Sequence, residues 1–476
     1  MGLSDEVRFP CDCIPEETRK VRLLGIYPQR QEGLVLQRIK IPGGRIRLDQ
    51  WRCLAKLARQ YTPEFPLHIT TRQDVELHGI RPADVPAIQT RLATLGMTCV
   101  GAAGDTMRNI VVCPQDGFRR ETWAVAGLAE SISAHAESLA WIADLPRKFK
   151  ISICGCQRAC ARAWIQDLGL IANADGTFRA IVAGSLGSKP GTGMLLFDSL
   201  ELNKVLPLVH AILRLFHAEG DRANRHRARL RHVRERLGDR AFAERVEMLL
   251  QVEAAKQHYP IPRLSRVESD TPLQFRLSLP LGDIMPADAM ELARAVEEVG
   301  AELRLGLQHD LFVFGETAPS LGTALAGLAN DISIVSCPGS AWCTRGIADS
   351  RGAAQRIRRR LPDGCRVSIV VGGCPNNCSH AAVAPIGLLG RIKRLQGKRV
   401  EGFRVFIGGG SGQSSALGRQ LHDFVPAEDV DEAVSWLVQR CGRATDGVGD
   451  LTLPEFSSIE FKRFEEEFCR RFGVVE

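Results

Sequence analysis

Four segments in the first half of this 476-residue chain recur in its second half in the same order. The matched pairs are residues 38–46 and 276–284, 67–74 and 303–310, 113–119 and 337–343, and 151–160 and 369–378. Their offsets are 238, 236, 224 and 218, and the last pair aligns without a gap. Self-similarity of this kind is the signature of an internal duplication. We therefore expect the two halves to fold on one plan, with a seam near residues 255–270.

The repeated segments have the pattern of a strand, a turn and a helix. Residues 38–41 alternate polar and apolar side chains and run into Pro42-Gly43-Gly44, which is typical of a half-buried strand that ends in a turn. A chain of this length exceeds what one hydrophobic core usually supports, so several domains are expected. The predicted parts are residues 1–115, a half-domain with an N-terminal extension; 116–260, an α/β lobe with a basic helical linker; 261–331, a second half-domain; and 332–476, a second α/β lobe with C-terminal helices.

Composition limits the class of protein. Hydrophobic residues make up 45% of the chain and charged residues 25%, which is ordinary for a globular domain. No run of eighteen apolar residues exists, so no membrane span is expected. Residues 1–8 lack the apolar stretch of a secretory signal, which favours a cytoplasmic location. Fifteen cysteines are too few for a disulfide scaffold of this length, and we expect reduced thiols with some committed to metal.

Residues 222–236 are unusually basic, with seven arginines and two histidines in a helical pattern. Nucleic-acid binding is one interpretation, but no aromatic residues interleave with these cations and no groove-reading motif accompanies them. A solvated helix face or a carboxylate-binding surface is favoured instead, and we expect no nucleic-acid partner.

Four cysteines of the second half are spaced as metal ligands. Five residues separate Cys337 from Cys343, and three separate Cys374 from Cys378. Thiolates on two short Gly/Pro loops can converge on one soft metal centre. A gap of five residues fits zinc poorly, so a four-iron, four-sulfur cluster is favoured. The alternative is four unrelated buried cysteines.

These two cysteine pairs resemble the cluster signature of the sirohaem-dependent nitrite and sulfite reductase family, the ferredoxin-type sulfite reductase haemoproteins. The resemblance extends from about residue 25 to about residue 410. It implies that Cys337, Cys343, Cys374 and Cys378 bind the cluster and that Cys378 is also the proximal ligand of the sirohaem iron. Asn376 would then lie against the macrocycle.

Compact basic segments of the first half also resemble the family. By its pattern, the distal face of the sirohaem is lined by Arg38, Arg108, Lys148 and Lys150. Arg72 matches an arginine that contacts sirohaem carboxylates, and Arg229 is a further candidate for that role. At His68 some relatives have another cofactor-binding arginine, so the chain departs from the pattern there. Arginine and lysine suit a bound oxyanion, because they stabilise the negative charge that builds when its oxygens leave, and lysine can protonate them.

The two halves have specialised. Arg72 aligns with Gln308, while Arg119 stands where the second half has the ligand Cys343. The first half nevertheless keeps Cys113, Cys156 and Cys160 at ligand positions, with Cys154 as an extra neighbour. A relic without metal is favoured, and a second cluster completed by Cys154 or another residue is the alternative.

The family resemblance implies an α+β fold, internally duplicated with pseudo-twofold symmetry, in which two ferredoxin-like half-domains and two larger α/β lobes surround a sirohaem. The first hypothesis for function is six-electron reduction of sulfite to sulfide, because sulfite-reducing members tend to have lysine at the position of Lys150. The alternative is reduction of nitrite to ammonium, and a third possibility is a non-catalytic electron-relay subunit, which would need no oxyanion pocket. No flavin or nicotinamide domain is evident, so an external ferredoxin or flavoprotein donor is expected.

Overall fold

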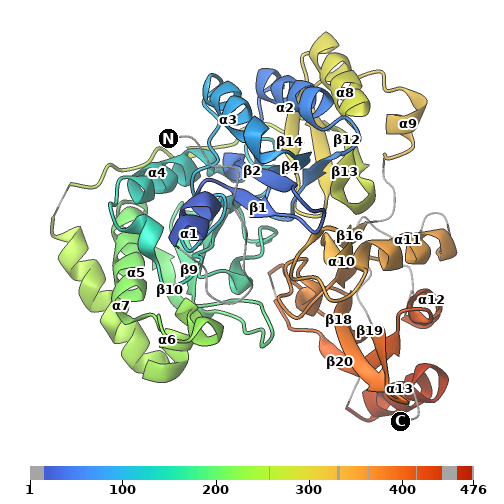
Figure 1. Ribbon diagram of the computed structural model, residues 1–476. Helices are drawn as coiled ribbons and strands as arrows, with labels where there is room; N and C mark the ends of the chain where they lie inside the picture. The colour runs from blue at the N-terminus through green and yellow to red at the C-terminus, as the bar shows by residue number, and fades with distance from the viewer. Residues whose placement is uncertain are drawn as a thin grey trace. The chain divides into compact units, whose positions relative to one another are not determined.

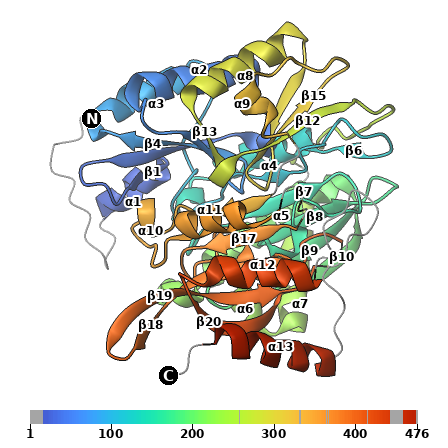
Figure 2. The same ribbon diagram turned by 90° about the vertical axis from the view of Figure 1, so that its right-hand side faces the viewer.

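The computed structural model describes residues 16–256, 258–329, 333–362, 365, 367–413, 415–441 and 458–473 (Figures 1 and 2). These residues form two units. The first contains the described residues up to Ser185, together with Thr192–Arg276 and Asp283–Ala326. The second contains Leu186–Gly191, Leu277–Gly282 and the described residues from Gly327 onward. Within the described residues no helix is long and apolar enough to cross a membrane.

Two small β-sheets follow the same plan, and they belong to the first unit apart from the last two residues of β12. The first contains β1 (Ile26–Pro28), β2 (Val35–Lys40), β4 (Asp74–Ile80), β3 (Leu67–Ile69) and β13 (Asp283–Ile284) in that order, with α2 (Leu48–Tyr61) and α3 (Val85–Ala93). The second contains β12 (Leu273–Ser278), β15 (Asp310–Phe314) and β14 (Glu302–Leu305), with α8 (Pro286–Glu298) and α9 (Thr323–Ala326). In each, a strand and a helix are followed by a hairpin whose last strand lies in the middle. This arrangement confirms that the half-domain is duplicated.

Backbone pairing shows the pseudo-twofold relation between the two half-domains. Asp283 pairs with His68, and Arg45 forms a bridge with Arg304. At the offsets of the repeat, Asp283 is the second-half counterpart of Arg45, and Arg304 is the second-half counterpart of His68. Exchanging the two halves therefore turns the Asp283–His68 contact into the Arg45–Arg304 contact. The helices of the two half-domains lie side by side (Figure 1), and Trp51 Nε1 on α2 donates a hydrogen bond to the carbonyl oxygen of Ala289 on α8 at 2.8 Å.

The larger sheets of the two α/β lobes have the same topology. In the first unit the order is β10 (Met194–Leu200), β9 (Phe178–Val182), β8 (Leu168–Ala172), β7 (Ile151–Cys154) and β5 (Val111–Val112). In the second unit it is β16 (Ile334–Ser336), β17 (Ile369–Gly372), β18 (Ile386–Leu395), β19 (Lys398–Ile407) and β20 (Arg419–Pro426). The first three strands of each, in chain order, are parallel and the last two are antiparallel.

The register of the strands repeats as well. Ile151 pairs with Leu168 in the first lobe, and Ile369 pairs with Ile386 in the second, both at the offset of 218 found in the sequence. The loops after β7 and β17 each contain a residue in the left-handed region at the matched position. These residues are Ala159 and Asn377, each with φ of 54°. A non-glycine residue pays about 1–2 kcal/mol for that conformation, so its presence in both loops indicates that the two loops share one shape.

Helices cover these sheets and complete two separate hydrophobic cores. In the first lobe they are α4 (Ala126–Glu137), α5 (Val205–Glu219), α6 (Leu230–Leu237) and α7 (Asp239–Ala254), whose apolar faces join the sheet in one core. In the second lobe they are α10 (Gly339–Trp342), α11 (Ser350–Arg360), α12 (Val430–Cys441) and α13 (Ser458–Phe472). Phe468 of α13 is fully buried in that core. The α+β duplication is thus confirmed, while the four predicted domain boundaries stay a prediction.

The basic stretch at residues 222–236 lies partly on α6 and is rich in ion pairs. Six of its seven arginines pair with carboxylates, among them Arg225 with Asp105 and Arg234 with Asp239. Its charge therefore serves the packing of the first lobe.

Candidate cofactor and anion site

The four predicted cluster cysteines lie on two loops at one edge of the second lobe's sheet. Cys337 follows β16 and Cys343 caps the C-terminus of α10, whereas Cys374 and Cys378 follow β17. Because β16 and β17 are parallel neighbours, their carboxyl ends lie at the same edge, which brings the two loops together.

The four sulfurs lie close enough to interact electrostatically. Burial is the main cause that raises the pKa values of Cys337, Cys343 and Cys374, the last to about 12, and in each case the neighbouring Cys378 raises the pKa further. Among the described residues none of these four cysteines forms a disulfide, and Cys378 is exposed, as is Asn376. The structure therefore groups all five second-half site residues predicted from the sequence.

Backbone N–H groups point at these sulfurs. The amide of Gly373 donates to Cys337 Sγ at 3.1 Å, and the amide of Arg345 donates to Cys343 Sγ at 3.4 Å. Such bonds stabilise thiolates and tune the potential of iron–sulfur clusters. In the part of the chain that the structure describes, no three histidine, cysteine, aspartate or glutamate side chains are placed to hold a single metal ion. A cluster carries its four ligands on separate irons, so this wider set of thiols fits a cluster better than one ion.

The predicted anion-binding residues lie in the first unit on neighbouring backbone segments. A parallel bridge joins Met107 to Phe149, and both side chains are buried in the core. Since side chains alternate along extended segments, Arg108, Lys148 and Lys150 lie on the opposite face.

Three of these cations surround Tyr27, a residue that the sequence analysis missed. Burial raises the pKa of Tyr27, but the charges of Arg108, Arg38 and Lys148 lower it more, to about 8. Arg38 lies 5.1 Å from the centre of the tyrosine ring, and Arg38 and Arg108 both donate to the carbonyl oxygen of Ala102, at 3.3 and 3.0 Å. The one sequence signal was rarity, because Tyr27 is one of three tyrosines in the chain.

Arg38 and Arg108 differ in how their charges are balanced. Arg38 donates from Nε to the buried carboxylate of Glu76 at 2.7 Å. Burial raises the pKa of Glu76, but Arg38 outweighs it and holds that pKa far below its usual range. Among the described residues Arg108 has no carboxylate partner, and it donates to the backbone oxygens of Ala102 and Gly104. Positive charge therefore remains available beside Tyr27.

Of the two predicted carboxylate-binding arginines, Arg229 is buried and Arg72 is half-buried. Arg72 donates to Gln166 Oε1 at 3.0 Å and to the carbonyl oxygen of Asn109 at 2.6 Å, and burial lowers its pKa to about 10. Arg229 pairs with Asp167 at 2.6 Å, and the same carboxylate oxygen accepts from the backbone N–H of Lys150 at 2.8 Å.

One donor of each of these arginines is unsatisfied. The Nε atoms of Arg72 and Arg229 are buried and have no hydrogen-bond partner among the described residues. Arg108 lines a pocket that is open to solvent, whose other lining residues are Arg19, Arg22, Tyr27, Gly104, Asp105, Arg147 and Arg225. Unsatisfied guanidinium donors and an arginine-rich pocket fit a cofactor that carries many carboxylates.

Comparison with known proteins identifies the family. Residues 103–253 and 327–443 match the nitrite and sulphite reductase 4Fe-4S domain, and residues 27–95 match the nitrite/sulfite reductase ferredoxin-like half domain. The chain belongs to the nitrite and sulfite reductase family. The cofactors of this family are sirohaem and a four-iron, four-sulfur cluster, as the resemblance implied.

Individual relatives of the family cover almost the whole chain. An assimilatory ferredoxin-dependent nitrite reductase from Haloferax mediterranei is 29% identical, over 90% of this chain and 84% of its own length. A ferredoxin–nitrite reductase from Leptolyngbya laminosa is 27% identical, over 90% and 91%. The NirA protein of Mycobacterium tuberculosis has the same fold, with a TM-score of 0.75 over 90% of this chain and 88% of its own at 22% identity.

Proposed function

We propose that this chain reduces nitrite to ammonium in a six-electron reaction, with electrons from an external donor of the ferredoxin class. The observation that carries the proposal is the convergence of Arg38, Arg108 and Lys148 on one site in a member of this family. A relay subunit would need no such cationic site. The similar proteins named as ferredoxin-dependent nitrite reductases favour nitrite over sulfite and ferredoxin over a flavoprotein.

Each predicted site residue has a role in this proposal. Cys337, Cys343, Cys374 and Cys378 hold the cluster, Cys378 also ligates the sirohaem iron, and Asn376 lies against the macrocycle. Arg72 and Arg229 bind cofactor carboxylates with the donors that have no other partner among the described residues. The sirohaem, when bound, supplies an iron that takes the anion and passes it electrons.

The cations of the first unit handle the anion. Arg108 and Arg38 hold it by charge-assisted hydrogen bonds, which are about twice as strong as neutral ones. Lys148 supplies protons to oxygens that leave as water, and Lys150 adds a second positive charge on the same face. Burial lowers the pKa of Arg38, but the charge of Glu76 outweighs it and raises that pKa, so Arg38 stays ionised when it holds the anion.

One observation favours sulfite as a second candidate. Lys150 stands at a position where sulfite-reducing family members tend to have lysine. Its backbone is fixed by Asp167, so the start of its side chain is held in place. Sulfite is largely dianionic near neutral pH and gains more from an added ammonium group than nitrite does.

The test is anaerobic steady-state turnover of the cofactor-loaded chain with reduced ferredoxin and each anion. We expect kcat/KM for nitrite to exceed that for sulfite, with ammonium as product. A higher kcat/KM for sulfite would select the second candidate. Absence of turnover with both anions, in a chain that contains both cofactors, would leave the electron-relay role.

A further inference from the structure

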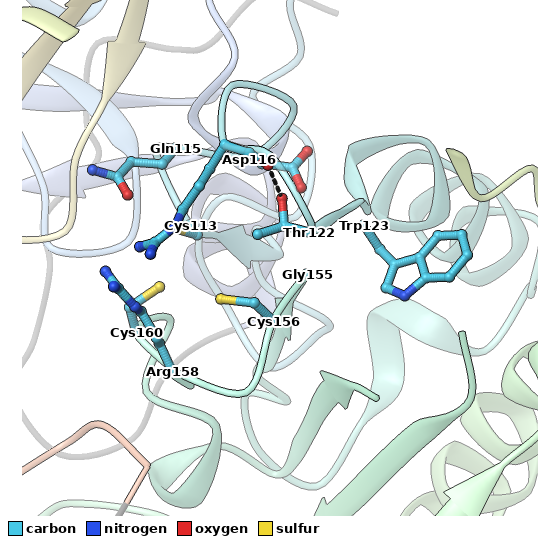
Figure 3. Close-up of a pocket in the computed structure, with 10 residues that line it drawn as sticks. Cys113, Gln115, Asp116, Thr122, Trp123, Gly155, Cys156, Arg158 and Cys160 are labelled. Atoms are coloured by element: carbon cyan, nitrogen blue, oxygen red, sulfur yellow. Dashed lines mark hydrogen bonds between the residues drawn. The ribbon is translucent and has the colours of Figure 1, made fainter. Parts of the chain in front are cut away.

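Positions at which the two halves of the duplication differ in charge show where each half has specialised. The cysteine-bearing loops are one example. In the first lobe Cys113, Cys156 and Cys160 line a pocket (Figure 3). Arg119 lines the same pocket and stands at the position that Cys343 has in the second lobe. The sheets of the two half-domains differ in the same way, and there the difference lies beside the predicted anion site.

Two polar residues of β4 are replaced by apolar ones in its counterpart, β15. At the offset of 236 found in the sequence, the position of Glu76 is taken by Phe312. His78 likewise corresponds to Phe314. Both phenylalanines are buried, so the second half-domain packs with apolar side chains at these two positions. The fold therefore does not require a carboxylate or an imidazole there.

The strand register places Glu76 directly opposite the predicted anion-binding residue Arg38. Glu76 pairs with Arg38 of β2 on one side and with His68 of β3 on the other. His68 in turn pairs with Asp283 of β13. Directly opposite residues of antiparallel strands point to the same face of a sheet. These four polar side chains therefore form one row across four strands.

Hydrogen bonds hold both carboxylate oxygens of Glu76. Arg38 donates from Nε to Oε1 at 2.7 Å. An ionised carboxylate only accepts, so His78 donates from Nε2 to Oε2 at 3.1 Å. Glu76 is 3% exposed and His78 is fully buried. Since water screens a buried charge little, the carboxylate of Glu76 acts strongly on the charges around it.

Arg276, the second-half counterpart of Arg38, is balanced by a different carboxylate. It donates from Nε to Asp310 Oδ2 at 2.8 Å. Asp310 corresponds to Asp74, so the first half retains that aspartate and has Glu76 in addition. Glu76 is therefore an added negative charge on the strand beside Arg38.

We propose that Glu76 is a specificity-determining residue that favours nitrite over sulfite by offsetting the charge of Arg38. The inference rests on the proposed function, because it takes Arg38 to hold the anion. A fixed negative charge repels a dianion about twice as strongly as a monoanion at the same place, since the Coulomb energy follows the product of the charges. Nitrite has one negative charge, whereas sulfite is largely dianionic near neutral pH. Glu76 acts through Arg38 and needs no contact with the anion.

Two substitutions separate the charge of Glu76 from its shape. Glu76→Gln keeps the size of the side chain and an oxygen that can accept from Arg38, but removes the charge. Glu76→Asp keeps the charge and shortens the side chain. The Kd of each anion is measured by optical titration of the sirohaem in the oxidised, cofactor-loaded chain, at one fixed pH near neutrality. We expect Glu76→Gln to shift the ratio of the two Kd values toward sulfite by about tenfold, which corresponds to about 1.4 kcal/mol, and Glu76→Asp to leave the ratio nearly unchanged.

Glu253→Gln is the matched control for this ratio. Glu253, on α7 of the first lobe, is also a buried carboxylate that pairs with an arginine, since Arg214 Nη1 lies 2.5 Å from its Oε1. It lies outside the row of β4, and we expect the control to leave the ratio unchanged. An unchanged ratio in Glu76→Gln, or an equal shift in Glu76→Asp or in Glu253→Gln, would overturn the proposal.

The ionisation of Tyr27 gives a second readout that needs neither cofactor nor turnover. Burial raises the pKa of Tyr27, and the charges of Arg108 and Arg38 are among those that lower it to about 8. Loss of the carboxylate that offsets Arg38 should lower this pKa further in Glu76→Gln, whereas Glu76→Asp should keep it at about 8. Ultraviolet difference spectroscopy of the cofactor-free chain measures the change. A Tyr27 pKa that does not fall in Glu76→Gln would overturn the proposal, whereas absence of turnover with both anions would contradict the proposed function alone.

Discussion

Tyr27 offers a direct test of whether the cations of the first unit converge as described. Its pKa of about 8, against an ordinary value of 10.0, is a difference of about two units. Each unit corresponds to about 1.4 kcal/mol, so the surroundings favour the ionised form by about 3 kcal/mol after the opposing effect of burial is included. At pH 8 about half of Tyr27 is ionised in the folded chain, whereas an ordinary tyrosine is about 1% ionised.

The sign of the linked stability follows from the lowered pKa. Ionised Tyr27 stabilises the fold, and this stabilisation is fully present above the unfolded pKa of about 10 and is lost as the pH falls through about 8.

Ultraviolet difference spectroscopy of the cofactor-free chain measures tyrosinate directly. We expect one tyrosine to ionise around pH 8, and Tyr27→Phe should remove that step. Tyr259 does not interfere, because burial and Glu253 raise its pKa. Arg108→Ala should raise the pKa of Tyr27 by about one unit or more, since it removes both a nearby charge and a hydrogen bond.

Arg240→Ala is the matched control for loss of one positive charge. Arg240 lies on α7 with its side chain 93% exposed, and it should leave the titration unchanged. If Tyr27→Phe retains the step near pH 8, or if Arg240→Ala shifts it as far as Arg108→Ala does, the described convergence is wrong.

Three further predictions concern the cofactors, the substrate and the fold. Cys378→Ser should abolish reductase activity and the magnetic coupling between cluster and sirohaem, measured by electron paramagnetic resonance, whereas Cys160→Ser should keep both. Lys150→Asn should lower kcat/KM for sulfite by at least about tenfold, because a charge-assisted contact is worth roughly 1.5–3 kcal/mol. The same change should alter kcat/KM for nitrite little, and an equal loss for both anions would contradict this prediction. Asn109→Ala should lower the thermal unfolding midpoint of the cofactor-free chain, since Asn109 Nδ2 lies 2.9–3.3 Å from three backbone carbonyl oxygens and the change removes these hydrogen bonds at a cost of about 1–3 kcal/mol. An unchanged midpoint would refute this prediction.

The duplication could be predicted in detail because each repeated element is encoded by a short continuous segment of the sequence. The offset of 218 between the matched segments also relates the paired residues of the strands, since Ile151 pairs with Leu168 and Ile369 pairs with Ile386. The cluster loops were equally accessible, since each pair of cysteines is local and follows a strand whose apolar run marks its end. Local spacing and the order of strands were enough to group these thiols.

Residues that act through distant contacts could not be found in this way. Tyr27 meets Arg108 across 81 positions of the chain, and Asp167 meets Arg229 across 62. Neither Tyr27 nor Asp167 belongs to a repeated motif, and each gains its role only when the fold brings a cation beside it. The choice of anion is harder still, because it depends on the summed charge around the site and not on Lys150 alone.

The cysteine-bearing loops of the two lobes show how one substitution can change the ligands that a duplicated site offers. Both follow strands in the same order, both have a residue in the left-handed region at the same position, and both have cysteines at three equivalent positions. Where the fourth position is Cys343, four thiol ligands are available for a cluster. Where it is Arg119, one of these thiols is absent and a positive charge is added. A guanidinium cannot ligate iron as a thiolate does, so one substitution is enough to make the ligand sets of the two loop pairs different.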